Sequence, residues 1–344
     1  MAERKNRRMQ QLLQSQRHQL ILSILLPLAL NQAAQAQPVS LTSPRDFVVG
    51  NSINQILDPP DVLPKDHLLC SHNDWATVIL GQSPGQFDGT LFQWDTTCPI
   101  SSGPDLSAPL VTDRPDFTEA SSTVGRGVAQ LEFGYTFTRD DTATTQTESH
   151  SFAEPLLRYG IIAEWLELRI AANYATEKTN GVKINGTEDL YLGFKIGLTP
   201  QDGLLPEMAL IPQMTVPTGA SVFTANDVLP GANWIYGWEL SDCLSTAGST
   251  QVNRAIDDGT GSNYAEWAQS WTFAYTITEQ IGAYTEWYAF FPDTADTAVT
   301  EHYLNGGFTV LLNDDIQWDI RVGRGLSGAA DDYFVGTGLS VRFK

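Results

Sequence analysis

The last stretch of the chain alternates between two kinds of side chain. From Tyr333 to Phe343, every second position is apolar or aromatic, with Thr337 as the exception. The positions between them carry mostly small or polar residues and end on Arg342. A period of two is the pattern of a β-strand. One apolar face opposite a small, polar face is typical of a strand that lies between lipid and a polar interior.

The same pattern appears where the regular part of the chain begins. Between 127 and 139, Leu131, Phe133, Tyr135 and Phe137 alternate with smaller or polar residues. A first and a last strand of this kind can pair with each other, and closure is how a sheet satisfies its edges inside a membrane. We therefore expect the sheet to close on itself.

Between these two stretches, the alternation predicts about twelve strands in all. The segments are 127–139, 148–160, 164–177, 187–199, 206–217, 231–241, 244–256, 264–277, 281–291, 300–312, 316–324 and 332–343. Short connections alternate with longer, polar ones, as in bacterial outer-membrane barrels. The sequence thus predicts an all-β fold, a transmembrane antiparallel up-and-down β-barrel over residues 110–344. A soluble β-sandwich is the alternative, but it has no reason to alternate loop lengths.

The N-terminal part has a different character. Residues 1–36 combine a basic start, an apolar run from Leu20 to Leu30 and the small-x-small site Ala34-Gln-Ala36, which together predict a cleaved secretory signal peptide. An uncleaved anchor is the alternative, and translation could begin at Met1 or Met9. Residues 37–109 are rich in proline and predict an irregular periplasmic extension or a partial plug of the barrel. The expected location is the bacterial outer membrane.

Charge and cysteine content limit which partners, disulfides and metal sites the chain can have. The chain has 40 acidic residues against 20 Lys and Arg, so we expect no nucleic-acid partner, which would require clustered positive charge. Cys70 and Cys98 share the irregular segment, and we expect them to form a disulfide. Cys243 is then the free thiol, although it could instead tether the extension to the barrel. No cysteine–histidine cluster or calcium-loop spacing is present, so we expect no metal and no cofactor.

Strand parity assigns a set of charged residues to the barrel interior. They are Glu132, Glu167, Arg169, Lys195, Glu286, Asp319, Arg321 and Arg342. Opposite charges in a narrow lumen are expected to pair, because an isolated charge in a confined space is costly. In particular, we expect Asp319, Arg321, Glu286 and Arg342 to contribute to one ionic network. Such a lumen is either a polar conduction path or a sealed, salt-bridged interior, and parity does not distinguish the two.

Several segments resemble a known family. They are Leu110-Val-Thr-Asp-Arg-Pro-Asp-Phe-Thr-Glu119 with Gly127 and Gln130-Leu-Glu132, then His302–Gly307, Asp319–Gly325 and Asp331–Phe343. Residues 108–344 resemble the outer-membrane transporter family that is also called the meta-pathway phenol-degradation β-barrel family. The resemblance implies a monomeric outer-membrane barrel with a transport role. Lys344 departs from the pattern, because such barrels usually end on the aromatic residue.

Asp113, Arg114 and Asp116 precede the first strand, at the periplasmic mouth. They could fold into the lumen and pair with wall residues, or they could belong to a turn set by Pro115. The family resemblance favours the first alternative, a structural latch.

Three functions follow from these expectations. The first is a channel or transporter through which small solutes, hydrophobic or aromatic ones included, diffuse passively along a polar lumen. The second is a sealed structural or adhesive barrel without transport. The third, an outer-membrane hydrolase, has the least support, because no Gly-x-Ser-x-Gly turn occurs and the histidines stand apart. We therefore expect no enzyme, and as partners only outer-membrane lipid and a small-molecule solute.

Overall fold

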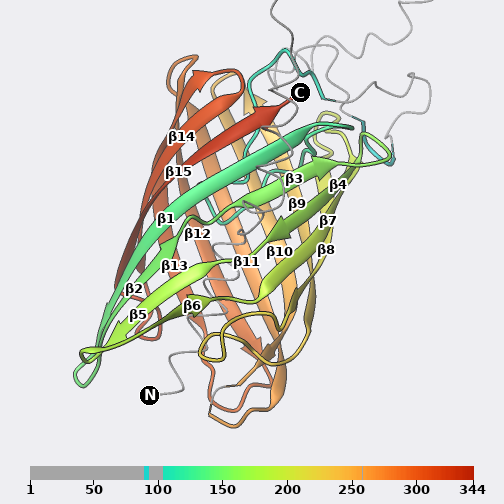
Figure 1. Cartoon of the computed structure of the whole chain (residues 1–344). Helices are drawn as coiled ribbons and strands as arrows, with labels where there is room; N and C mark the ends of the chain where they lie inside the picture. The colour runs from blue at the N-terminus through green and yellow to red at the C-terminus, as the bar shows by residue number, and fades with distance from the viewer. Residues whose placement is uncertain (1–88, 93–103, 258) are drawn as a thin grey trace, which may run out of the picture.

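A computed structural model describes residues 89–92, 104–257 and 259–344 (Figure 1). All its regular elements are strands, joined in one antiparallel sheet. The strands are β1 (Ala129–Asp141), β2 (Gln146–Phe152), β3 (Leu156–Gly160), β4 (Leu166–Ala171), β5 (Tyr174–Thr179), β6 (Val182–Thr187), β7 (Leu190–Thr199), β8 (Glu207–Val216), β9 (Leu229–Ser241), β10 (Leu244–Ile256), β11 (Asn263–Thr276), β12 (Ile281–Asp293), β13 (Glu301–Asn313), β14 (Ile316–Gly325) and β15 (Tyr333–Phe343). Within these described ranges, no helix is long and apolar enough to cross a membrane.

The sheet closes through its first and last strands. β1 pairs antiparallel with β15 from Ala129 opposite Phe343 to Arg139 opposite Tyr333. The other strands pair in an up-and-down order around the barrel, so the prediction of a closed antiparallel barrel is confirmed. The short turns and both ends of the sheet lie at one end, which is the periplasmic end in bacterial barrels. The longer loops lie at the other end.

Three predicted strands are each interrupted once, so twelve spans of the wall appear as fifteen strands. The interruptions separate β2 from β3, β4 from β5, and β6 from β7. At the first, Ala153 and Glu154 adopt positive φ angles of 62° and 25° just before Pro155, which has no N–H to donate. β1 consequently pairs with β3 near the periplasmic end and with β2 near the other end.

The sequence also predicts a loop from Lys178 to Gly186, and this expectation is wrong. β5 and β6 form a hairpin there, with Asn180 and Gly181 at φ angles of 50° and 85° in the turn. Asn-Gly is the pair that best tolerates two consecutive left-handed residues, which a tight hairpin turn requires. The dipeptide therefore decides the structure of a segment whose side chains show only weak alternation.

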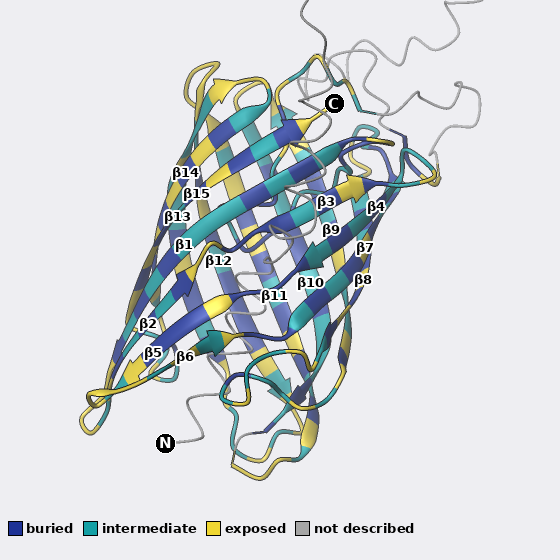
Figure 2. Cartoon of the chain, in the orientation of Figure 1, coloured by how far each residue is buried: buried dark blue, intermediate teal, exposed yellow. Residues whose placement is uncertain are grey.

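The two faces of the wall differ in chemistry. Figure 2 shows the resulting stripes of buried and exposed positions along each strand. One set of large aromatic side chains points outward and is exposed, which suits the headgroup level of a membrane. They include Trp234, Trp267, Trp271, Tyr275, Tyr333 and Phe343. The inward positions carry polar and charged side chains, many of them fully buried.

At the long-loop end, Asp257 holds two loops together. Its carboxylate accepts hydrogen bonds from the backbone N–H of Thr297 at 2.7 Å and of Ala298 at 3.1 Å, and from the Thr297 hydroxyl at 2.8 Å. Burial alone would raise the pKa of Asp257, but these hydrogen bonds outweigh it and hold the pKa below its ordinary value. The loop between β12 and β13 is thereby fixed to the loop after β10.

We expect this contact to be lost in acid. Because the folded pKa is depressed, the contribution of Asp257 is fully present above the ordinary value of about 3.9 and disappears as the pH falls through the folded pKa. Protease cleavage within residues 294–299 should therefore increase below about pH 4. Asp257→Asn should be cleaved there already at neutral pH, and equal protection of this variant at pH 7 would contradict the assignment.

Candidate functional site

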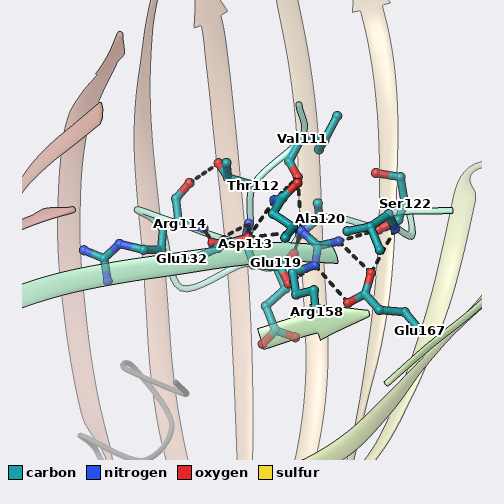
Figure 3. A network of polar contacts seen from close by, with 12 residues as sticks. Val111, Thr112, Asp113, Arg114, Glu119, Ala120, Ser122, Glu132, Arg158 and Glu167 are labelled. Atoms are coloured by element: carbon teal, nitrogen blue, oxygen red, sulfur yellow. Dashed lines mark hydrogen bonds and ion pairs between the residues drawn. The ribbon is translucent and has the colours of Figure 1, made fainter. Parts of the chain in front are cut away.

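Residues 110–124, here called the lumen segment, run through the inside of the barrel before β1 begins. The segment enters at the periplasmic end, where the N–H of Leu110 donates to the carbonyl of Asp314 at 2.8 Å. It leaves toward β1 at Val124, whose N–H donates to Glu167 at 3.0 Å. Figure 3 shows its residues in contact with side chains that project from the wall strands. The lumen is therefore occupied by a stretch of chain that is not part of the sheet.

Asp113 is the centre of the densest group of charges. Its carboxylate lies 2.7 Å from the Lys195 ammonium, 2.5 Å from the Arg169 guanidinium and 3.4 Å from that of Arg158. Its backbone N–H donates to Glu132 at 3.1 Å. All these side chains are fully buried, so the charges depend on one another for compensation. Asp113 thus connects the lumen segment to four strands of the wall, β1, β3, β4 and β7.

Arg158, on β3, links the lumen segment to two wall carboxylates. It forms ion pairs with Glu167 at 2.8 Å and Glu132 at 3.2 Å. Its remaining N–H groups donate to the backbone carbonyls of Val111 at 3.1 Å and Ser122 at 3.0 Å. The planar fork of five donors is thus satisfied by side chains and backbone together, which a lysine could not reproduce.

Arg114 points to the other side of β1, toward β15 and β14. Its guanidinium pairs with Glu154 at 2.7 Å and with Asp319 at 3.3 Å. It lies flat against the wall over Gly134 and Gly338, where an added Cβ would come within 2.4 Å and 2.3 Å of it. These two glycines make room for the guanidinium, which is their role in the wall.

Glu286, on β12, holds the middle of the segment. Its carboxylate accepts hydrogen bonds from the N–H groups of Phe117 and Thr118, from the Thr118 hydroxyl and from the Asn305 amide, all at 2.7 Å. The Phe117 ring stacks on Tyr288. One buried carboxylate therefore fixes both the backbone and, through it, the ring position of Phe117.

The last part of the segment is anchored on the neighbouring strands. Glu119 accepts from Arg169 at 3.1 Å and from the Asn233 amide at 3.3 Å. Lys195 also donates to the Ala120 carbonyl at 2.7 Å. From residue 111 to residue 124 the segment is thus held by contacts to strands all around the wall.

A family model described as "Putative MetA-pathway of phenol degradation" matches residues 112–343. The chain belongs to this family. The match includes most of the lumen segment together with the whole barrel. With its closed antiparallel sheet and outward aromatic residues, this member of the family is a barrel of the bacterial outer membrane.

Solved structures with a similar fold are distant in sequence. The NanC porin is 12% identical, with a TM-score of 0.39 over 63% of this chain and 99% of the porin chain. The translocator domain of autotransporter NalP from Neisseria meningitidis is 10% identical, with a TM-score of 0.40 over 64% of this chain and 89% of that chain. The transport unit of autotransporter AIDA-I from Escherichia coli is 9% identical, with a TM-score of 0.42 and coverages of 63% and 89%. The search of curated proteins found no match.

The structure separates the predicted interior residues into two groups. Glu132, Glu167, Arg169 and Lys195 meet around Asp113, as just described. Asp319, Arg321, Glu286 and Arg342 do not form the expected common network. Asp319 pairs with Arg114, Glu286 binds backbone N–H groups, and Arg321 donates to the Pro115 carbonyl at 2.8 Å and the Thr136 hydroxyl at 3.0 Å. The physical reason is that the lumen segment lies between these wall residues and supplies nearer partners.

Arg342 lies at the periplasmic mouth rather than inside this group. It pairs with Asp315 at 2.8 Å and donates to the Ala108 carbonyl at 2.7 Å, where the chain enters the barrel. Lys344, the residue that departs from the family pattern, also pairs with Asp315 at 2.9 Å. The hydrogen bond from Lys344, followed by that from Arg342, lowers the pKa of Asp315. The end of β15 is thus fixed to the turn between β13 and β14.

The predicted latch residues lie on the lumen segment. Asp113 and Arg114 are buried and contact the wall, whereas Asp116 is half-buried. That they act as a latch remains a proposal. Cys70 and Cys98 lie outside the described residues, while Cys243 is exposed with a free thiol.

Sequence reasoning missed three charged residues of the site. The sequence does indicate that Arg158 faces the lumen, because it alternates with the apolar residues Leu157 and Tyr159 on its strand. Strand parity could not place Glu119 or Glu154, since Glu119 lies outside any strand and Glu154 lies at the interruption between β2 and β3.

Proposed function

We propose that this protein is a channel through which small solutes diffuse across the outer membrane, and that the lumen segment is its closed gate. The observation that carries the proposal is the nature of what fills the barrel. Besides pairing with one another, the wall's inward side chains bind a separate segment that lies before β1 and is not part of the sheet. A segment outside the sheet can leave without breaking any strand pairing.

The lining supports a polar path once the segment moves. Glu132, Arg158, Glu167, Arg169 and Lys195 would then face water in place of Asp113 and its neighbours. Water can solvate charges that would be costly if left dry and unpaired. We propose a monomer that works by passive diffusion. The aromatic side chains inside the barrel, together with the family's description, favour aromatic solutes as the cargo.

A sealed structural barrel is the second candidate, favoured by the complete burial of the ion pairs around Asp113. Breaking such pairs is costly, and a scaffold would have no reason to break them. The two candidates differ in what a loosened lumen segment should do to ion flow.

The test is the bilayer conductance of the refolded protein and of Gly134→Ala. The added Cβ would lie 2.4 Å from the Arg114 guanidinium, so it should displace this side chain from Glu154 and Asp319 and increase the open fraction about tenfold. Gly197→Ala is the matched control, because Gly197 also lies on a wall strand but its Cβ would meet nothing closer than 3.8 Å.

Three outcomes separate the candidates. Higher conductance for Gly134→Ala alone supports the gate. A less stable but non-conducting Gly134→Ala protein supports the sealed barrel. Equal conductance for the wild type and both variants would show that the lumen segment does not control ion flow.

A further inference from the structure

The ring of Phe117 fills an aromatic slot in the wall. It stacks on Tyr288 with ring centroids 4.7 Å apart and planes 5° apart, and it meets Phe290 edge-on at 5.6 Å. Tyr288 in turn stacks on Tyr303 at 4.8 Å. Stacked and edge-to-face contacts are the two favoured geometries of aromatic pairs. The slot therefore suits one flat six-membered ring, and a residue of the lumen segment now occupies it.

The groups beside the slot accept hydrogen bonds. Glu286 receives the N–H of Phe117 at 2.7 Å, and its other partners are the donors of Thr118 and Asn305, which are all neutral. An ionised carboxylate offers only acceptors. A molecule that replaces Phe117 must therefore carry a donor near its ring.

The two acidic residues beside the slot have no ion-pair partner in the described part of the chain, and the nearby Arg321 lies over Phe334 rather than against them. Among the described residues, neither Glu286 nor Asp116 forms an ion pair within 4 Å, and the donors that reach Glu286 are backbone N–H, hydroxyl and amide groups. Arg321 is engaged with Pro115 and Thr136 instead. A positively charged donor would compensate this pair better than the neutral N–H that is there now.

We propose that the slot is a binding site for single-ring aromatic amines, and that Phe117 is an internal ligand that occupies it when the gate is closed. The backbone nitrogen, Cα, Cβ and ring of Phe117 have the connectivity of 2-phenylethylamine. Such an amine places its ring on Tyr288 and its ammonium at Glu286, and it binds in competition with the lumen segment. The proposal rests on the proposed function, because it makes solute binding and gate opening the same event.

The test is binding of 2-phenylethylamine to the full-length protein refolded in detergent, measured by calorimetry. Phe117→Ala should bind about tenfold more tightly than the wild type, because the competing ring is gone. Phe308→Ala removes a ring from the outward, exposed face of β13 and should bind like the wild type. In Phe117→Ala, 2-cyclohexylethylamine should bind about tenfold more weakly than the aromatic amine, and phenylacetate should not bind. Adding Glu286→Gln should weaken amine binding about tenfold.

Heat-modifiable gel migration verifies the folding of each variant. If Phe117→Ala does not refold, Phe117→Leu takes its place, because leucine keeps most of the apolar volume. Unchanged affinity in the folded variant, or equal affinity for the cyclohexyl analogue, would overturn the proposal. The two proposals fail separately. If Gly134→Ala conducts but Phe117→Ala binds no amine, the binding-site proposal fails and the gate proposal stands. If Phe117→Ala binds the amine but no variant conducts, the gate proposal fails.

Discussion

Replacing Asp113 by asparagine is expected to open the lumen and to lower the free energy of unfolding by about 3–5 kcal/mol. Asp113 is the carboxylate shared by Lys195, Arg169 and Arg158, all of them fully buried. An asparagine of the same size keeps the shape but removes the charge, and its amide presents donors to guanidinium groups that are themselves donors. The barrel can relieve the uncompensated cations by admitting water, which requires the lumen segment to leave.

The measurements are urea unfolding in detergent and single-channel conductance. Asp227→Asn is the matched control, since Asp227 pairs with Arg254 at 2.5 Å in an exposed loop and should contribute only about 0–1 kcal/mol. Its conductance should equal that of the wild type. If Asp113→Asn were as stable and as closed as Asp227→Asn, the charges around Asp113 would not hold the lumen segment.

Arg158→Lys should cost about 3 kcal/mol although it preserves the charge. Lysine has three donors on a flexible stem, and it cannot reach Glu167, Glu132 and the backbone carbonyls of Val111 and Ser122 together. Buried acceptors would be left without a partner, and each of them costs about 1–3 kcal/mol.

The control for this substitution is Arg139→Lys. Arg139 pairs with Glu148 and Asp141 at the solvent-exposed end of β1, where the guanidinium fork matters less and the expected change is below about 1 kcal/mol. Urea unfolding of both variants measures the two losses in unfolding free energy. Equal losses would mean that the geometry of the Arg158 fork has no special value.

The wall could be predicted from the sequence because its signal is local. In β14 and β15, alternate residues separate lipid from lumen, and the parity that placed Asp319 inside depends on nothing beyond its own strand. The pairing of β1 with β15 followed from the same reasoning, since only closure satisfies both edges. Even β10, whose alternation is weak, occupies the predicted range of 244–256.

The site could be predicted only in part, because its contacts are not local. Arg114 meets Asp319, which lies 205 positions further along the chain, and no period within the lumen segment indicates this partner. Parity placed Glu286 and Arg321 inside but could not show that backbone groups of an inserted segment would bind them first. The expected network among the wall residues failed for this reason.

The short connection between the lumen segment and β1 sets a limit on how the proposed gate would respond to solute. Phe117 is the twelfth residue before Ala129, so its ring can move at most roughly 40 Å from β1 even when the connection is fully extended. A group on so short a flexible tether has an effective concentration in the millimolar range near its own site. A free aromatic amine that binds no better than the Phe117 ring must reach a similar concentration before it displaces that ring. In the gating that we propose, the tether therefore gives the barrel a threshold: the barrel stays closed at low concentrations of solute and opens when the solute accumulates.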